Sequence, residues 1–204
     1  MARNLTPIAK QSRREGVELH PKAVKALARR NFIPGQHGQS RRSKPSDFSV
    51  QLREIQKVKR LYGVLEKQFR NYVTRAEGME GVTGENLLSL LERRLDSTVY
   101  RLGFAPSRQA ARQMVTHAHI TLNGKKVDIP SIIVSPGDEI AVSAASQKKP
   151  LFKALGEELS DASTSSSWLS LNAKKMSAKV TGLPQRSEVD HDIAEQLIIE
   201  FYSR

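Results

Sequence analysis

The chain has no cysteine among its 204 residues, and aromatic residues make up only 5% of it. The absence of cysteine excludes a disulfide framework and a thiolate zinc site. No apolar run is long enough to cross a bilayer, and the opening MARNLTPIAK lacks the apolar core of a signal peptide. A hydrophobic content of 38% favours small helical cores over one large sheet sandwich. We therefore expect a soluble intracellular protein with one large domain or two small ones.

Acidic residues are scarce in the first third of the chain, and this gives the molecule its formal net charge of +12. Residues 1–75 hold 18 Lys and Arg against 5 Asp and Glu, residues 76–150 hold 9 against 8, and residues 151–204 hold 6 against 8. A basic excess of this size indicates a polyanionic partner, attracted mostly by the first third. A membrane surface fits less well, because no basic amphipathic anchor with a Trp or Phe face is present.

The basic segment 1–45 shows only weak periodicity. Pro34, Gly35, Gly38 and Pro45 interrupt its second half and predict an irregular loop there. Two interpretations of the segment remain open, a disordered basic tail and an arm that becomes ordered against a polyanion.

Two apolar repeats predict helices after this arm. Ser46 or Asp47 is a candidate cap for the first helix, whose apolar stripe runs over 52–65, and Gly63 predicts a bend or break. Leu and Val recur every three or four residues over 87–102, which predicts one further helix that ends at Gly103.

The remaining elements are short. Ser107 is expected to cap a helix whose rim carries Arg108 and Arg112, and a strand at 120–122 then leads into the Asn123-Gly124 hairpin turn. Further along, the sequence predicts a turn at 135–138, strands around 140–142 and 168–171, a helix at 151–159 and a polar linker at 162–167. Asp192 and Glu195 resemble a capping box for a last helix with an apolar side at 197–201.

His117 and His119 are the only pair with the look of a metal site. Zinc needs three or four ligands, and no nearby residue has the spacing of a further ligand. A general base needs a partnered nucleophile or carboxylate, and the sequence indicates no such partner. Hydrogen bonding to phosphate or ribose and plain packing at the helix–strand junction remain as alternatives. Lys125 and Lys126 fit either a solvated hairpin or a phosphate-binding surface. The phosphate loops of enzymes, GxxxxGK and GxGxxG, are absent.

The stretch LLERRLDSTVYRLGFAPSRQAARQMVTHAHITLNGKKVDIPSIIVSPGDEIAV resembles the S4 RNA-binding module, a helix pair followed by a small sheet. PGQHGQ at 34–39, LREIQKVKRLYGVLEKQFRNY at 52–72 and EQLIIEFYSR at 195–204 resemble the bacterial small-subunit ribosomal protein S4 family. The likeness covers nearly the whole chain and is weakest at 1–30 and 143–190. Many members carry an N-terminal cysteine cluster for zinc or an iron–sulfur centre. Ala9 and Ser12 occupy matching positions here, so no cofactor or metal is expected.

The resemblance implies an α+β fold with a basic N-terminal arm at 1–45, a helical domain at 46–91 completed by a helix at 192–204, and an S4 RNA-binding module with a Ser-rich insertion at 92–191. It implies a cytoplasmic, non-enzymatic constituent of the small ribosomal subunit that binds rRNA, nucleates assembly and influences translational accuracy. Implied partners are small-subunit rRNA, neighbouring proteins including S5 and, in some members, the protein's own mRNA, with no membrane. The candidate RNA-binding residues are Arg13, Arg14, Arg29, Arg30, His37, Arg41, Arg42, Lys44, Arg53, Lys57, Lys59, Arg60, Lys67, Arg70, Arg93, Arg108, Arg112, His117, His119, Asn123, Lys125 and Lys126.

Two other functions are known for proteins that could carry such a module. A pseudouridine synthase that uses the module as an anchor needs a separate catalytic domain, and the roughly 50 Ser-rich, acidic residues that follow the module leave no room for it. The other is a free-standing regulator that binds its own mRNA. The sequence does not distinguish such a regulator from a ribosomal protein that binds its own mRNA as a second role.

Overall fold

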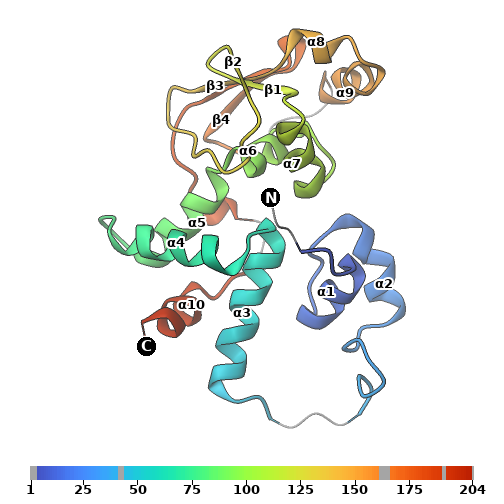
Figure 1. The fold of residues 1–204 in the computed structure, drawn as a ribbon, viewed down its shortest axis with the longest axis vertical. Helices are drawn as coiled ribbons and strands as arrows, with labels where there is room; N and C mark the ends of the chain where they lie inside the picture. The colour runs from blue at the N-terminus through green and yellow to red at the C-terminus, as the bar shows by residue number, and fades with distance from the viewer. Residues whose placement is uncertain (1–3, 41–43, 161–165, 190–191, 204) are drawn as a thin grey trace. The chain divides into compact units, whose positions relative to one another are not determined.

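The computed structural model describes residues 4–40, 44–160, 166–189 and 192–203. It divides into two compact units, one of residues 1–87 with 191–204 and one of residues 88–190. Within the described residues, no helix has the length and apolar character needed to cross a membrane. The order of elements is shown in Figure 1.

The first unit is helical. Its longest helix, α3 (Asp47–Tyr62), begins where the Ser46 hydroxyl accepts a hydrogen bond from the Ser49 N–H at 3.3 Å. It ends at Gly63, whose φ of 62° lies in the left-handed region that favours glycine. The predicted cap and the predicted break are both confirmed. The other helices are α1 (Ile8–Glu15), η1 (Pro21–Ala23), α2 (Val24–Arg29), α4 (Glu66–Glu77), the start of α5 (Thr83–Glu92) and α10 (Glu195–Tyr202).

Helices α1 and α2 lie in the basic segment, where weak periodicity gave no prediction of helix. Helix α1 is held by tertiary contacts of its charged side chains. The Arg13 Nε donates to the carbonyl of Phe32 at 3.0 Å, and its guanidinium lies 4.8 Å from the Phe32 ring centroid. Glu15, almost fully buried, forms ion pairs with Arg53 and Arg60 of α3. Described residues 31–40 form no helix, as expected.

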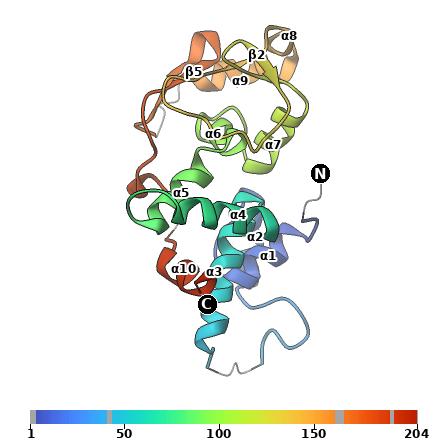
Figure 2. The same cartoon turned by 60° about the vertical axis from the view of Figure 1, so that its left-hand side comes forward.

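Helix α10 packs against α3, as predicted from its apolar side (Figure 2). Ile198 is fully buried, and the rings of Phe48 and Phe201 lie 5.5 Å apart. The capping prediction is wrong. The helix starts after Ala194, whose methyl side chain cannot accept a capping hydrogen bond. The Ala194 N–H instead donates to the Glu54 carboxylate at 2.9 Å.

The second unit is an α+β unit, which confirms the predicted fold class. Its antiparallel sheet has the strand order β2-β1-β3-β5-β4. One face of the sheet joins a common core with the helices, which includes Val99, Val115, Ile140, Phe152 and Val180. The strands are β1 (Ile120–Leu122), β2 (Lys125–Val127), β3 (Glu139–Val142), β4 (Leu169–Asn172) and β5 (Ser177–Val180). The helices are the end of α5, α6 (Leu95–Arg101), α7 (Arg108–Thr116), α8 (Ala144–Gln147), α9 (Pro150–Ser160), η2 (Ala173–Lys175) and η3 (Arg186–Glu188).

The apolar repeat over 87–102 does not form one helix, which corrects the sequence prediction. The chain breaks between α5 and α6, where Arg94 adopts an extended conformation (ψ 138°) and pairs with Ile133 in an isolated bridge. The Leu95 N–H donates to the carbonyl of Ile132 at 2.8 Å. Leucines four residues apart stay in register across such a break, so apolar periodicity alone does not detect it.

Candidate RNA-binding surface

Helix α7, the turn after it and the β1–β2 hairpin carry seven of the predicted site residues. The Ser107 hydroxyl caps α7 by accepting from the Ala110 N–H at 3.3 Å. Asn123 (φ 50°) and Gly124 (φ 77°) both have positive φ, as the tight hairpin turn requires. Both local predictions are confirmed.

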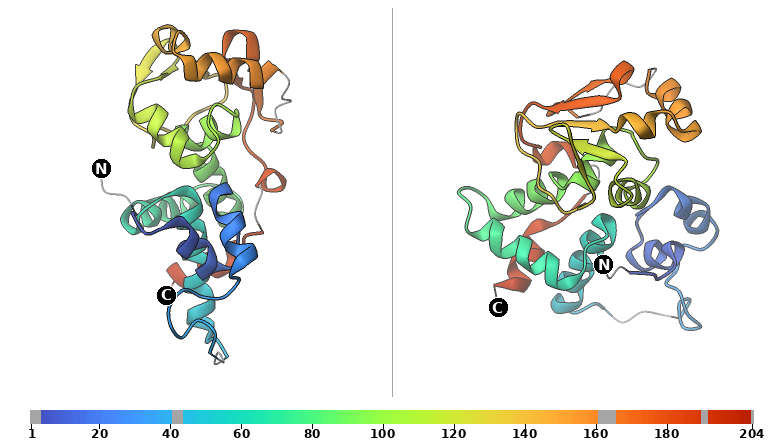
Figure 3. Two further views of the ribbon diagram at one scale, coloured as in Figure 1. Left: turned by 90° about the vertical axis from the view of Figure 1, so that its right-hand side faces the viewer. Right: turned by 45° about the horizontal axis from the view of Figure 1, so that its top comes forward.

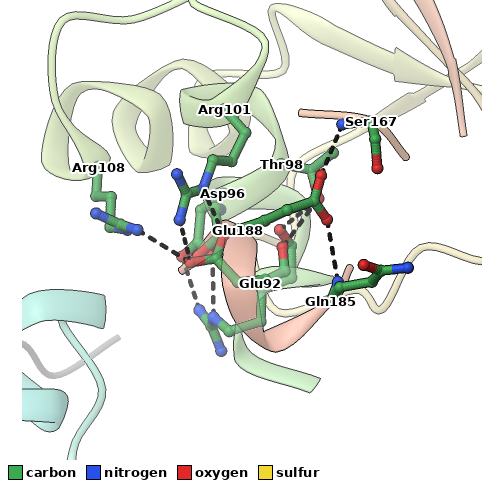
Figure 4. Close-up of polar contacts among 10 residues, drawn as sticks. Glu92, Asp96, Thr98, Arg101, Arg108, Ser167, Gln185 and Glu188 are labelled. Carbon is green, nitrogen blue, oxygen red and sulfur yellow. Dashed lines mark hydrogen bonds and ion pairs between the residues drawn. The ribbon is translucent and has the colours of Figure 1, made fainter. Parts of the chain in front are cut away.

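Two buried carboxylates, which we name the Glu92–Asp96 pair, organise the arginines around this element (Figure 4). Glu92 accepts two hydrogen bonds from Arg101, each of 2.8 Å, and a third from Arg108 at 3.2 Å. Asp96 accepts a fork of two bonds, 3.0 and 2.7 Å long, from fully buried Arg94. Such planar, paired contacts fix both partners in one orientation.

The Glu92–Asp96 pair also determines how Arg108 and Arg112 are presented. Arg108 reaches Glu92 and lies 4.7 Å from the Tyr100 ring centroid, while Arg112 lies 3.4 Å from Asp96. Their side chains are only 12% and 18% exposed. The sequence places both on the helix rim but does not reveal their internal partners. Glu92 ends α5 and Asp96 lies in the first turn of α6, and the apolar repeat predicts these two helices as one.

Asn123 uses its side-chain amide inside the hairpin. Its Nδ2 donates to the Asp138 carboxylate at 2.8 Å, and its Oδ1 accepts from the Glu139 N–H at 2.8 Å. These bonds tie the turn to the start of β3. The side-chain amide of Asn123, a candidate RNA-binding residue, therefore already has two hydrogen-bond partners within the protein.

Lys125 and Lys126 are both exposed on β2, at the edge of the sheet. Lys125 pairs with Leu122 and Lys126 pairs with Thr121. Because successive side chains of a strand point to opposite faces, the two ammonium groups diverge. The two lysines therefore lie on opposite faces of the edge strand β2.

His117 and His119 lie in the turn between α7 and β1. Their ring centroids are 6.1 Å apart. His119 Nδ1 lies 2.9 Å from the Ser146 hydroxyl, and its ring meets Phe152 edge-on. Burial, with Lys149 and His117 nearby, lowers the pKa of His119 and so favours its neutral form. Across the described residues, no three His, Cys, Asp or Glu side chains gather as metal ligands would.

The predicted cations outside α7 and the hairpin fall into two groups. Those with internal partners are Arg13, Arg53, Lys57, Lys59 and Arg60 in the first unit, and Arg93, which donates to the Val134 carbonyl at 2.9 Å. Those with exposed side chains are Arg14, Arg29, Arg30, His37, Lys44, Lys67 and Arg70. Arg41 and Arg42 lie outside the described residues. The exposed side chains are accessible to a polyanion, whereas those with internal partners stabilise the fold.

A helix pair, a tight basic hairpin and a small antiparallel sheet define an RNA-binding unit of the S4 class. Residues 93–140 match the family model described as the S4 domain, and residues 3–92 match that of the ribosomal protein S4/S9 N-terminal domain. Three relatives share 54%, 51% and 50% identity with this chain over the full length of both partners. They are the small ribosomal subunit proteins uS4 of Clostridioides difficile, Halothermothrix orenii and Chlorobaculum tepidum. The chain belongs to the uS4 family of small ribosomal subunit proteins, which are structural proteins and not enzymes.

Proposed function

We propose that the protein binds rRNA directly and early, and so nucleates assembly of the small ribosomal subunit in the cytoplasm. Full-length similarity to the uS4 proteins carries this proposal. The charge distribution supports it, because the exposed cations of the first unit and of the hairpin suit a phosphate backbone. A rigid helix and hairpin match the shape of folded RNA without reading its sequence.

The arginines that the Glu92–Asp96 pair holds in place lower the entropic cost of binding RNA. Arg108 and Arg112 are held by the Glu92–Asp96 pair, so little side-chain entropy remains to be lost when RNA binds. Lys125 and Lys126 supply mobile point charges on both faces of the edge strand. Residues 1–75, with 18 Lys and Arg against 5 Asp and Glu, add the largest share of net positive charge.

The finer roles implied by the family resemblance belong to the same proposal. They are contact with the neighbouring protein S5, an influence on decoding accuracy, and binding of the protein's own mRNA. Each of them needs the assembled subunit or a specific message as partner, so direct rRNA binding is the step to establish first.

The test is binding of the purified protein to naked small-subunit rRNA, followed by addition of the other ribosomal proteins. We expect the protein to bind without the others and to remain on assembled subunits after a high-salt wash. Binding that requires other proteins to be present first would contradict the nucleating role. Loss of the protein from subunits in the wash would contradict its role as a constituent.

A further inference from the structure

A second group of lysines lies on the α+β unit, and none of them is among the candidate RNA-binding residues named above. Lys148 and Lys149 link α8 to α9, and Lys174 and Lys175 lie in η2, between β4 and β5. All four side chains are exposed. We name these four residues the sheet-end lysines.

Hydrogen bonds bring the two lysine pairs together from separate parts of the chain. The Gln147 Nε2 donates to the carbonyl of Val142 at 2.9 Å and to that of Lys175 at 3.4 Å. The Val142 N–H donates to the carbonyl of Met176 at 3.0 Å. Helix α9 contacts η2, and Figure 3 shows α8 and α9 beside this part of the chain. The fold therefore holds the two backbone segments that carry these exposed lysines close to each other.

The strand register places these lysines at the end of the sheet opposite the hairpin turn. Ile120 pairs with Val142, and Ala141 pairs with Ser177, so β1 begins where β3 ends and β5 begins. The Asn123-Gly124 turn follows the other end of β1. His119 lies with the lysines, because its carbonyl accepts from the Ser143 N–H at 2.8 Å.

Few carboxylates accompany the sheet-end lysines in sequence. Residues 140–156 and 168–187, the segments that carry them, contain no Asp or Glu, although residues 151–204 are acidic as a whole. Four like charges held together repel one another, and a polyanion relieves that repulsion. Lysine presents a point charge and no planar donor set, which suits backbone phosphate better than base edges.

We propose that the sheet-end lysines form a second contact with RNA phosphates, separate from the hairpin lysines Lys125 and Lys126. The α+β unit then contacts RNA at both ends of its sheet, and this fixes the orientation of the unit along the RNA backbone. The inference rests on the proposed rRNA-binding function. It concerns residues beyond 140, where the match to the S4 domain model ends.

The cysteine-free sequence permits a direct test of this second contact. Lys149→Cys and Lys174→Cys each give a single site for a tethered iron–EDTA probe that cleaves nearby RNA, and Lys125→Cys reports on the hairpin. Lys179→Cys is the control, because Lys179 is exposed in the same unit but pairs across the strands with Glu139. We expect Lys149→Cys and Lys174→Cys to cleave shared rRNA nucleotides that neither Lys125→Cys nor the control cleaves. Cleavage no stronger than that of the control would overturn the proposal.

Affinity supplies a second, independent measurement on the full chain. Replacing all four sheet-end lysines with Ala should weaken binding to small-subunit rRNA about tenfold or more at 0.1 M salt, if at least two contact phosphates. Lys179→Ala should change affinity less than about twofold. Unchanged affinity of the fourfold variant, beside weakened binding by a Lys125→Ala/Lys126→Ala variant, would overturn the second contact and leave the proposed function standing. Failure of the unaltered protein to bind rRNA would overturn both.

Discussion

At the scale of single residues, buried charge is the feature that most constrains this molecule. Arg94 is fully buried, and Asp96 accepts its forked hydrogen bonds and also a contact from Arg112. A buried ion pair adds modest net stability, because desolvation of both ions offsets their attraction. Breaking it is costly, because one charge is left buried without its counterion.

This asymmetry predicts the effect of Asp96→Asn, which keeps the shape of the side chain and removes its charge. We expect the free energy of unfolding to fall by roughly 3–5 kcal/mol, because the guanidinium of Arg94 stays buried without its carboxylate. The measurement is denaturant unfolding of the full chain. Asp128→Asn, at an exposed position, is the matched control and should change stability by less than about 0.5 kcal/mol. Equal effects of both variants would show that the Arg94–Asp96 pair is not needed for stability.

At the scale of elements, the sequence predicted those that carry their own local signal. Ser46, Ser107 and the Asn123-Gly124 turn specify their conformations through nearby side-chain or backbone chemistry, and all three are confirmed. The break before α6, helices α1 and α2, and strand β5 were missed. Each depends on distant partners, such as Ile133 for Arg94 or Arg60 for Glu15, that no local pattern encodes. The inward orientation of Arg108 was missed for the same reason.

Helix α10 shows how a distant element completes a core, and it allows a sharp test. Ile198 is fully buried, and we expect Ile198→Ala to lower the free energy of unfolding by about 2–5 kcal/mol through lost burial and a cavity. Gln196→Ala, on the exposed side of the same helix, is the control and should be nearly neutral. Thermal melting of the full chain measures both variants. A melting temperature that Ile198→Ala leaves unchanged would mean that α10 does not stabilise the first unit.

At the scale of the whole molecule, charge is divided between stabilising the fold and binding a partner. Arg53, Arg60 and Arg101 form ion pairs with buried carboxylates. The positive charge of these three arginines is therefore largely neutralised within the fold. The exposed cations create the outward field, and counterion release makes their effect on RNA binding visible as a dependence on salt concentration. Salt dependence therefore separates cations that contact phosphate from cations that support structure.

The hairpin lysines give the clearest case, because both are exposed and neither forms part of the core. Replacing Lys125 and Lys126 together with Ala should flatten the slope of log affinity against log salt by roughly 1.5 to 2, if each contacts one phosphate. Stability should barely change, because exposed lysines on an edge strand contribute little to it. The measurement is affinity for an rRNA fragment at several salt concentrations, with a thermal melt of each variant and Lys179→Ala as the exposed control.

Weaker affinity with an unchanged slope would show that the lysines act through structure. If neither affinity nor slope changes, RNA contacts the protein elsewhere, and the exposed cations of the first unit become the surface to test.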